Sequence, residues 1–335
     1  MKSIAIGIGS YGISVISAMA DSNSFESVIA IDSDRNMLNG LSIEQKIFVS
    51  KRLPACDAVE RIKNKLKKLI SDTDIVFVIS NPIDSQSPYV IPHIVDYIKS
   101  MEYAVIVQVI DPSGKYDRKK KQEAKRVVDF LVDHFATIKI PQKNIALYGN
   151  RPNYKWYEYY LSQYLGRDKI LEQVEFDKWY LQSAYQNNAC ERDIIIGIFY
   201  LQRILELLNT EYPYATKEDV FSILSISGVI HLASAISVRI TTQKEQIELL
   251  RVRAFFNEII RTSTHGSKGL LFVLNVPERI SKEAVGQICY MMHTFSLENT
   301  RSAFTINVVK KDSKDISVKL IATGANDMDK EVDDY

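Results

Sequence analysis

The sequence has few cysteines, almost no net charge and no long apolar run, and each shortage excludes a class of protein. Its three cysteines, Cys56, Cys190 and Cys289, are far apart and match no metal-ligand spacing. This excludes a disulfide framework and favours three buried thiols in a reducing compartment. The net charge of +1 provides no global field to hold nucleic acid or an anionic membrane. No specific nucleic-acid partner is therefore expected.

No stretch of the sequence is suited to crossing a membrane. The longest apolar run, residues 194–201, is far shorter than the about 20 residues that a spanning helix needs. The N-terminus passes from one lysine and a short apolar run directly into glycines, which is not the pattern of a signal peptide. We expect a cytoplasmic protein that would reach a membrane only through a membrane-associated recruiter protein.

What the first half does contain is a series of apolar runs of strand length, separated by helical patterns. Their nearly continuous valine and isoleucine content is typical of strands buried on both faces, so it predicts a parallel, doubly wound sheet. The predicted strands are residues 3–8, 27–31, 74–79, 103–110 and 136–140, with amphipathic helices over 60–70 and 118–134. We therefore expect a Rossmann-like domain over residues 1–150.

The second half has a different composition. Residues 151–190 are dense in tyrosine and tryptophan, and we interpret them as an aromatic-rich helical insertion, with a ligand or partner surface as the alternative. Residues 191–209 predict a long central helix that is apolar around most of its circumference. Residues 210–326 predict a second α/β domain with a mixed sheet, and residues 327–335 form an acidic tail. Its predicted elements are helices over 242–264 and 282–293 and strands over 270–276, 304–310 and 316–323.

A glycine fingerprint lies at the start of the chain. Gly7, Gly9 and Gly12 form GxGxxG between the first strand and the first helix, and Asp32 ends the next strand about twenty residues on, which is the pattern of a dinucleotide site. The second half has no histidine near a carboxylate and no arginine clamp that would suit hydride transfer. An NAD(P)-binding Rossmann enzyme therefore stays an alternative hypothesis.

Motifs along nearly the whole chain, apart from the aromatic insertion, carry a second resemblance. They are IDSDRNML at 31–38, SDTDIVFVIS at 71–80, IKIPQ at 138–142, KEDVFSIL at 217–224, GSKGLLFVLNV at 266–276 and VKLIATG at 318–324. With these motifs the chain resembles the FtsZ branch of the tubulin superfamily. The resemblance implies the tubulin/FtsZ fold: a Rossmann-like GTPase domain, a long central helix and a second α/β domain. It also implies phosphate or nucleotide contacts at Gly7, Gly9, Ser10, Gly12, Ser14, Asp32 and Asp34.

The signature loop of that family is replaced here. In FtsZ the loop is Gly-Gly-Gly-Thr-Gly-Thr-Gly, whose backbone N–H groups wrap the phosphates, whereas the aligned residues 83–89 contain no glycine. Asp84 brings a negative charge to the implied phosphate position, and Pro88 has no N–H to donate. Where the family reads guanine, this chain has Asn188 and Arg192, and an arginine cannot accept a hydrogen bond from the base.

The loop that completes the active site of the next subunit in the family is also altered. Its Asn-x-Asp-x-x-Asp pattern corresponds to Tyr214, Thr216 and Asp219, with Glu218 beside the one remaining matched acid. We expect at most a vestigial catalytic acid here, because losing one preorganised group costs about 10² to 10³ in rate. The resemblance implies a head-to-tail subunit contact through Tyr214, Thr216, Lys217 and Asp219.

The hypothesis from the sequence is an FtsZ-like cytoskeletal or scaffold protein. It would assemble head to tail with itself or join a filament, in division, membrane remodelling or a related process, without GTP hydrolysis, a required cofactor or a metal. A slow paralogue that binds GTP or GDP at the first loop is the main alternative. Two basic helix segments, 63–68 and 118–126, are interpreted as solvated faces, with phospholipid or nucleic acid as the alternative contact.

Overall fold

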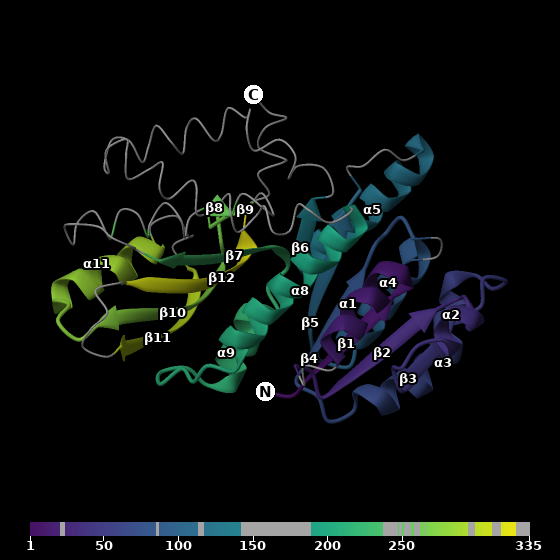
Figure 1. The fold of residues 1–335 in the computed structure, drawn as a ribbon, viewed down its shortest axis with the longest axis horizontal. Helices are drawn as coiled ribbons and strands as arrows, with labels where there is room; N and C mark the ends of the chain where they lie inside the picture. Colours follow the sequence, from purple (N-terminus) through teal and green to yellow (C-terminus); the bar gives the residue numbers. More distant parts are fainter. Residues whose placement is uncertain are drawn as a thin grey trace. The chain divides into compact units, whose positions relative to one another are not determined.

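The chain divides into two compact units in this computed structural model (Figure 1). The first unit comprises Met1–Gln142, Ala189–Asn209 and Leu224–Val229, and the second Lys143–Asn188, Thr210–Ile223 and Ile230–Tyr335. The residues that the structure describes are 1–20, 24–84, 87–112, 117–141, 189–236, 247, 250, 256–257, 262–264, 266–293, 299–309 and 316–325. The acidic tail lies outside them, as does the aromatic insertion up to residue 188.

The first unit is built on a parallel sheet with the strand order β3-β2-β1-β4-β5-β6. The strands are β1 (Ser3–Ile8), β2 (Ser27–Asp32), β3 (Gln45–Phe48), β4 (Ile75–Ser80), β5 (Ala104–Asp111) and β6 (Ala136–Pro141). Gly228 and Val229, the first residues of β7 (Gly228–Ile236), pair with β6. Every residue of β1 and β4 is buried, as expected of strands covered on both faces.

Helices cover both faces of this sheet. The helices are α1 (Gly9–Ala20), α2 (Arg35–Asn39), α3 (Ala55–Ile70), α4 (Ser87–Lys99), α5 (Arg118–His134) and α8 (Ala189–Leu208). The apolar sides of α3, α4 and α5 share one core with Val107 and Val109 of β5. Gln108, between them, faces the other way and donates through Nε2 to the Tyr11 hydroxyl of α1, 3.3 Å away. Tyr11 in turn donates to the Asp193 carbonyl oxygen of α8, so α1 and α8 lie together on the opposite face.

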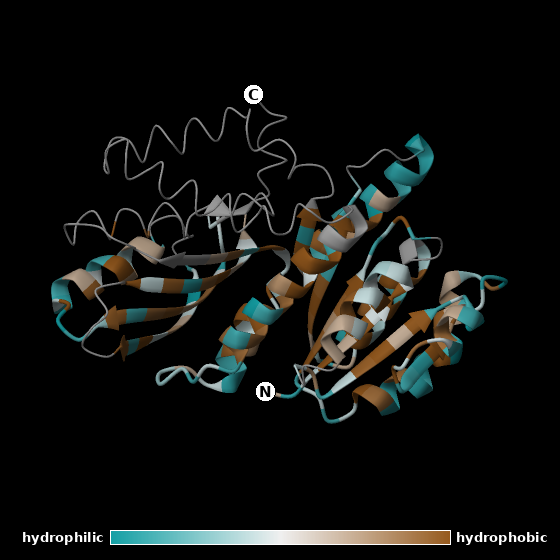
Figure 2. Ribbon diagram, in the orientation of Figure 1, coloured by the Kyte–Doolittle hydropathy of each residue, from teal (hydrophilic) through white to brown (hydrophobic). Residues whose placement is uncertain are grey.

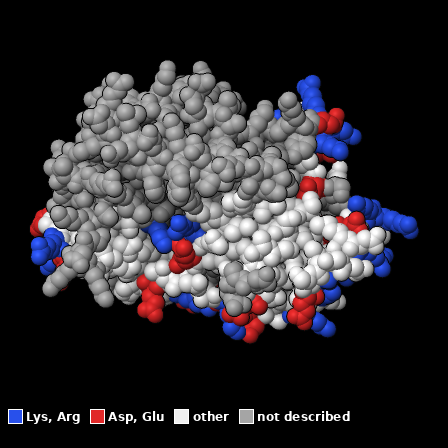
Figure 3. All heavy atoms as spheres, in the orientation of Figure 1, with Lys and Arg blue, Asp and Glu red and all other residues white. Residues whose placement is uncertain are grey.

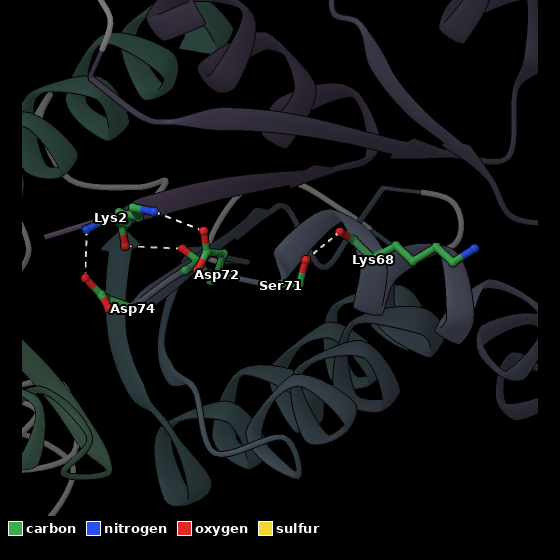
Figure 4. A network of polar contacts seen from close by, with 6 residues as sticks. Lys2, Lys68, Ser71, Asp72 and Asp74 are labelled. Atoms are coloured by element: carbon green, nitrogen blue, oxygen red, sulfur yellow. Dashed lines mark hydrogen bonds and ion pairs between the residues drawn. The ribbon is translucent and has the colours of Figure 1, made fainter.

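The start of β1 is tied to the turn that precedes β4 (Figure 4). The Lys2 backbone N–H donates to the Asp74 carboxylate over 2.8 Å, and its ammonium group donates to Asp72 over 3.0 Å. Asp72 has a positive φ of 72°, a conformation that its short side chain tolerates. At the end of α3, the Ser71 hydroxyl donates to the Lys68 carbonyl oxygen. These contacts fix the register of the two central strands at their amino ends.

The second unit has a mixed sheet with the strand order β11-β10-β12-β7. β10 (Gly269–Pro277) pairs in parallel with β11 (Arg301–Val309) and antiparallel with β12 (Ser317–Ala325). Its core is completed by α11 (Lys282–His293), and the buried Thr323 hydroxyl donates to the Ile223 carbonyl oxygen of α9 (Lys217–Leu224). A short antiparallel ribbon joins β8 (Phe256–Asn257) to β9 (Thr262–Ser263).

The predicted fold class, a parallel sheet followed by a central helix and a mixed α/β part, is confirmed. Figure 2 shows that the central strands are almost uniformly apolar, which is why they could be predicted from the sequence. The sequence prediction lacks β3, which is short with two half-buried and one exposed residue, and it also lacks β7. The helix predicted over 242–264 is wrong at its end, where β8 and β9 lie.

Some smaller expectations need correction. Cys56 is exposed in the first turn of α3 and Cys289 is only half-buried, so the prediction of three buried thiols is wrong. The central helix begins at Ala189, two residues earlier than predicted, because Ala189 and Cys190 belong to α8. Among the described residues, no helix is both long enough and apolar enough to cross a membrane.

Candidate functional site

The candidate site is a pocket of about 220 Å³ at the carboxyl ends of β1, β2 and β4. It lies where β1 and β4 adjoin and the winding of the sheet reverses, which is where open α/β sheets bind ligands. Its lining residues are Ile8, Gly9, Ser10, Ile31, Asp32, Ser33, Asp34, Met37, Val49, Lys51, Asp84 and Val90. The volume is below the about 300 to 1,000 Å³ of sites that enclose drug-sized ligands.

Two of the three fingerprint glycines face protein backbone. A Cβ on Gly7 would lie 2.5 Å from the Gly12 carbonyl oxygen and 2.8 Å from the Ile13 nitrogen. A Cβ on Gly12 would collide with the Ile79 carbonyl oxygen of β4. These glycines therefore let α1 pack closely on β1 and β4. Gly9 differs, since its φ of 74° is the left-handed conformation that glycine adopts without strain.

The carboxylate of Asp84 lies at the N-terminus of α1. Its Oδ2 accepts hydrogen bonds from the Ser10 hydroxyl over 2.9 Å and from the Tyr11 backbone N–H over 3.2 Å. That N–H is one of the donors at a helix start that have no partner within the helix and that commonly hold phosphate. An acidic side chain of the chain itself thus takes the position in which a bound anion would lie.

A tight turn after β4 holds Asp84 in this place. The Asp84 backbone N–H donates to the Asn81 carbonyl oxygen over 3.0 Å, and the Ile83 N–H donates to the Asn81 side chain over 3.1 Å. Pro82 occupies the second position of this four-residue turn, where its fixed φ is favourable. The turn therefore limits how far Asp84 can move from α1.

Burial raises the pKa of Asp84 above its ordinary value, and the negative charge of Asp32 adds to the effect. The hydrogen bonds from Tyr11 and Ser10 act in the opposite direction, because they favour the ionised carboxyl group. The loss of hydration outweighs them. Asp84 consequently occupies a site suited to an anion but is ionised less readily than an exposed aspartate.

The acids of the second loop are engaged in local structure. Asp32 Oδ1 accepts a hydrogen bond from the Asp34 backbone N–H over 2.7 Å. Asp34 caps α2, since its Oδ1 accepts from the backbone N–H groups of Asn36 and Met37. With Asp84 these residues give the pocket three carboxylates, and Lys51 is the one basic residue of its lining. The pocket lining therefore carries an excess of negative charge.

The other residues predicted for this site are placed as follows. Gly9 and Ser10 line the pocket, whereas the Ser14 hydroxyl lies one turn along α1 and donates to the Ser10 carbonyl oxygen. Pro88 is in the first turn of α4, where a missing N–H is tolerated. Asn188, residues 85–86 and the side chain of Arg192 lie outside the described part of the chain.

Sequence reasoning missed the apolar wall of the pocket, formed by Ile8, Ile31, Met37, Val49 and Val90. The last residues of β1 and β2 could have indicated this wall from the sequence, because the carboxyl ends of parallel strands meet at one edge of a sheet. No group of three or more potential metal ligands occurs within the described ranges.

The predicted subunit-contact residues stand together at the start of α9. Asp219 Oδ2 accepts hydrogen bonds from the Thr216 backbone N–H over 2.8 Å and from the Thr216 hydroxyl over 2.9 Å. The Asp219 N–H donates back to that hydroxyl oxygen, which completes a capping box. These bonds, the backbone one first, lower the pKa of Asp219. Tyr214 is 92% exposed and Glu218 is also exposed.

The two basic segments lie on the outer faces of α3 and α5. Figure 3 shows acidic side chains among the basic ones at the exposed end of α5. On α3, Lys63 pairs with Glu60 and its ammonium group lies 5.2 Å from the centroid of the Tyr97 ring. Such local pairing agrees with solvated helix faces and gives no separate ligand site.

Comparison with solved structures identifies the fold. FtsZ of M. jannaschii, in an empty dimer, matches with a TM-score of 0.65 and 16% identity over 96% of this chain and 88% of that chain. CetZ2 from Haloferax volcanii, a protofilament with bound GTPγS, matches with a TM-score of 0.65 and 12% identity over 97% and 94%. TubZ of Clostridium botulinum phage c-st matches with a TM-score of 0.56 and 12% identity over 99% and 95%.

No protein-family model and no curated protein matches the sequence. The chain nevertheless has the tubulin/FtsZ fold over nearly its whole length, as the sequence motifs predicted.

Proposed function

We propose that the protein is an FtsZ-like cytoskeletal protein that assembles head to tail without binding or hydrolysing GTP. The observation that carries the proposal is the Asp84 carboxylate at the N-terminus of α1, hydrogen-bonded to Ser10 and Tyr11. A phosphate group would have to displace it from these two donors. Hydrogen bonds to a charged group contribute about 1.5 to 3 kcal/mol each, so the displacement is costly.

Charge and size support the same conclusion. A nucleoside triphosphate would bring further negative charge to a pocket lined by Asp32, Asp34 and Asp84 with Lys51 as the only base of its lining. The pocket volume of about 220 Å³ is also small for a nucleotide. The same reasoning disfavours NAD(P), because its pyrophosphate would need the helix terminus that Asp84 occupies.

Assembly is supported by the fold and by the exposed contact loop. The similar structures include a dimer of FtsZ and a protofilament of CetZ2. In this chain the loop before α9 is stiffened by the capping box of Thr216 and Asp219, and it exposes Tyr214. A head-to-tail contact joins two different surfaces, so it leads to open-ended filaments. Cytoplasmic location and recruitment to a membrane by a partner protein belong to the same proposal.

Sedimentation and electron microscopy of nucleotide-free protein test this function. We expect filaments at low salt and high protein concentration, with the same critical concentration whether or not GTP is added. Assembly that requires GTP would favour the slow GTPase instead. Protein that remains monomeric under all of these conditions would contradict the proposed assembly.

A further inference from the structure

The outermost strands of the two units, β3 and β11, each pair with one described strand only (Figure 1). The unpaired side of such an edge strand presents backbone N–H and C=O groups that can pair with a strand of another chain. Folded proteins commonly obstruct these edges, often with a lysine side chain. The two edges of this protein differ in that respect.

The edge of β3 is obstructed by a lysine. The Val49 backbone N–H donates to the Asp32 carbonyl oxygen of β2 over 2.9 Å, and backbone groups alternate sides along a strand, so the Lys46 carbonyl oxygen points away from β2. The Lys65 ammonium group of α3 donates to that carbonyl oxygen over 2.6 Å. An incoming strand would have to displace this ammonium group.

The edge of β11 has no such obstruction among the described residues. The Arg301 backbone N–H donates to the Lys268 carbonyl oxygen over 3.0 Å, which directs the odd-numbered residues of the strand toward β10. The outward backbone groups therefore belong to Ser302, Phe304, Ile306 and Val308. Phe304 packs against the core, whereas the side chains of Ile306 and Val308 are 38% and 66% exposed. This edge thus combines unpaired backbone groups with exposed apolar side chains.

A row of polar side chains crosses the sheet and ends at this edge. The Asn275 side chain of β10 donates to the Ser317 hydroxyl of β12 over 3.0 Å, and the Asn307 side chain of β11 donates to Asn275 over 3.1 Å. The three residues are register partners in the sheet. The Asn307 amide is exposed and has a second N–H and a carbonyl oxygen to offer. One more residue that both donates and accepts can therefore continue the row.

The groups on β11 are complementary to those of a second copy of the chain. From Ser302 to Val309 the strand has no charged side chain, so two copies can pair without placing like charges opposite each other. An amide matches a second amide, because each supplies a donor and an acceptor. When two Asn307 residues are opposite each other in an antiparallel pair, Ile306 of each copy is opposite Val308 of the other.

We propose that β11 of one copy pairs antiparallel with β11 of a second copy, around a two-fold axis between their Asn307 residues. The Asn307 residues then form a non-hydrogen-bonded backbone pair, in which the Cα atoms are about 4.5 Å apart and the side-chain amides meet. Ile306 and Val308 form the flanking pairs, which exchange backbone hydrogen bonds. The contact joins identical surfaces and closes with two copies, so it is separate from the proposed head-to-tail assembly.

Disulfide cross-linking of the full chain tests the proposal. All variants carry Cys56→Ser, which removes an exposed native thiol. Asn307→Cys places two thiols at the two-fold axis, where the Cα separation of about 4.5 Å suits a disulfide. Ser302→Cys is the matched control, because this position is exposed on the same strand but its two copies are about 34 Å apart along the pair.

The rate of covalent dimer formation is the quantity to measure, with oxidised glutathione as the oxidant. We expect Asn307→Cys to form the dimer at least about 10-fold faster than Ser302→Cys, because pairing raises the effective concentration of the two thiols. Mass spectrometry should locate the bond between the two substituted positions. The paired stretch from Thr305 to Val309 is short, and small interfaces are typical of weak contacts, so a covalent trap is suited to detect this dimer.

Blocking variants in the Asn307→Cys chain identify the edge. Val308→Lys obstructs β11 with a lysine, and we expect it to slow cross-linking at least about 10-fold because each dimer contains the substitution twice. Val308→Pro is a second blocking variant, since the N–H that it removes points away from β10. Gln122→Lys, on an exposed position of α5, is the control for the added charge and should leave the rate unchanged.

Two results would overturn the inference. Equal rates for Asn307→Cys and Ser302→Cys would show that no register is preferred. Cross-linking of Asn307→Cys that neither Val308 variant slows would show that the thiols meet through another surface. Filament formation is measured separately on the wild-type protein, so failure of this inference leaves the proposed function standing, and the reverse also holds.

Discussion

Replacing Gly7 by alanine separates two roles of the fingerprint glycines. If the fingerprint glycines serve to let the backbone approach a phosphate, Gly7→Ala should affect ligand binding and leave the fold intact. In the structure a Cβ at this position lies 2.5 Å from the Gly12 carbonyl oxygen and 2.6 Å from the Gly12 carbonyl carbon. Both are backbone atoms, so no side-chain rotation relieves the contact. Either α1 moves away from β1 or the strand shifts.

The size of the effect follows from this geometry. Inserting a methyl group into a well-packed core costs typically about 1 to 3 kcal/mol, and here the contact is with rigid backbone. We expect Gly7→Ala to lower the free energy of unfolding by about 3 kcal/mol, at the upper end of that range. Gly286 provides the matched control: it is exposed within α11, and a Cβ there meets nothing within 4 Å. Gly286→Ala should stabilise the protein by about 0.5 to 1 kcal/mol, the usual difference between the two residues in a helix.

Urea unfolding followed by far-ultraviolet circular dichroism measures both variants. We expect the two glycine-to-alanine substitutions to change the free energy of unfolding in opposite directions. If Gly7→Ala shifted the unfolding free energy by less than about 0.5 kcal/mol, as a surface substitution does, the close packing of α1 on β1 would be wrong. The glycines would then have to be explained by a ligand.

Three further predictions concern the pocket and the contact loop. Burial raises the pKa of Asp84, so the contribution of Asp84 to stability is full below its ordinary pKa of 3.8 and is lost as pH rises through the raised value. Asp84→Asn removes this loss, so the stability advantage of the variant over wild type in urea titrations should grow with pH from about 3.8 and then level off. An advantage that does not depend on pH would refute the raised pKa of Asp84. Thr216→Ala removes the cap of α9 and should cost about 1 kcal/mol of stability. NMR titration of this variant should show the pKa of Asp219 rising toward its ordinary value, because one hydrogen bond is lost. Thr216→Ser should restore both the stability and the lowered pKa. Asp34→Ala should cost about 1 kcal/mol through the α2 cap, and Asp34→Asn, which can cap equally well, should cost little; equal losses in the two variants would mean that the charge, not the cap, matters.

Much of the fold could be predicted because hydrophobic periodicity follows directly from burial. The bounds of β1, α5 and α11 agree with the sequence prediction to the residue. β3 could not be found in this way, because an edge strand of four residues with one buried side chain has no pattern to detect. The end of the 242–264 segment shows the opposite failure, in which a helical period is overridden by strand pairing at β8 and β9.

The site was only partly predictable. The fingerprint identified Gly7, Gly9 and Gly12, but a glycine needed for close packing and one needed for phosphate look the same in a sequence. Asp84 was placed near the phosphate position by resemblance alone, and its bonds to Ser10 and Tyr11 depend on the turn at Asn81, which only the structure defines.

The role of Asp219 in capping α9 had a readable signal, because Thr-x-x-Asp before an apolar run resembles a capping box. The resemblance implied two roles for this residue, as a vestigial catalytic acid and as part of the subunit contact. Its hydrogen bonds to Thr216 give it a structural role that does not require a nucleotide.

We infer that the N-terminus of α1, where β1 adjoins β4, is occupied by the Asp84 carboxylate of the chain itself and binds no guanine nucleotide. The most direct measurement is chromatographic assay of nucleotide released from freshly purified, denatured protein, combined with calorimetric titration of the native protein with GTP. We expect no released nucleotide and no binding heat at millimolar GTP. Stoichiometric GDP in the released fraction, or saturable binding with one site per chain, would contradict it.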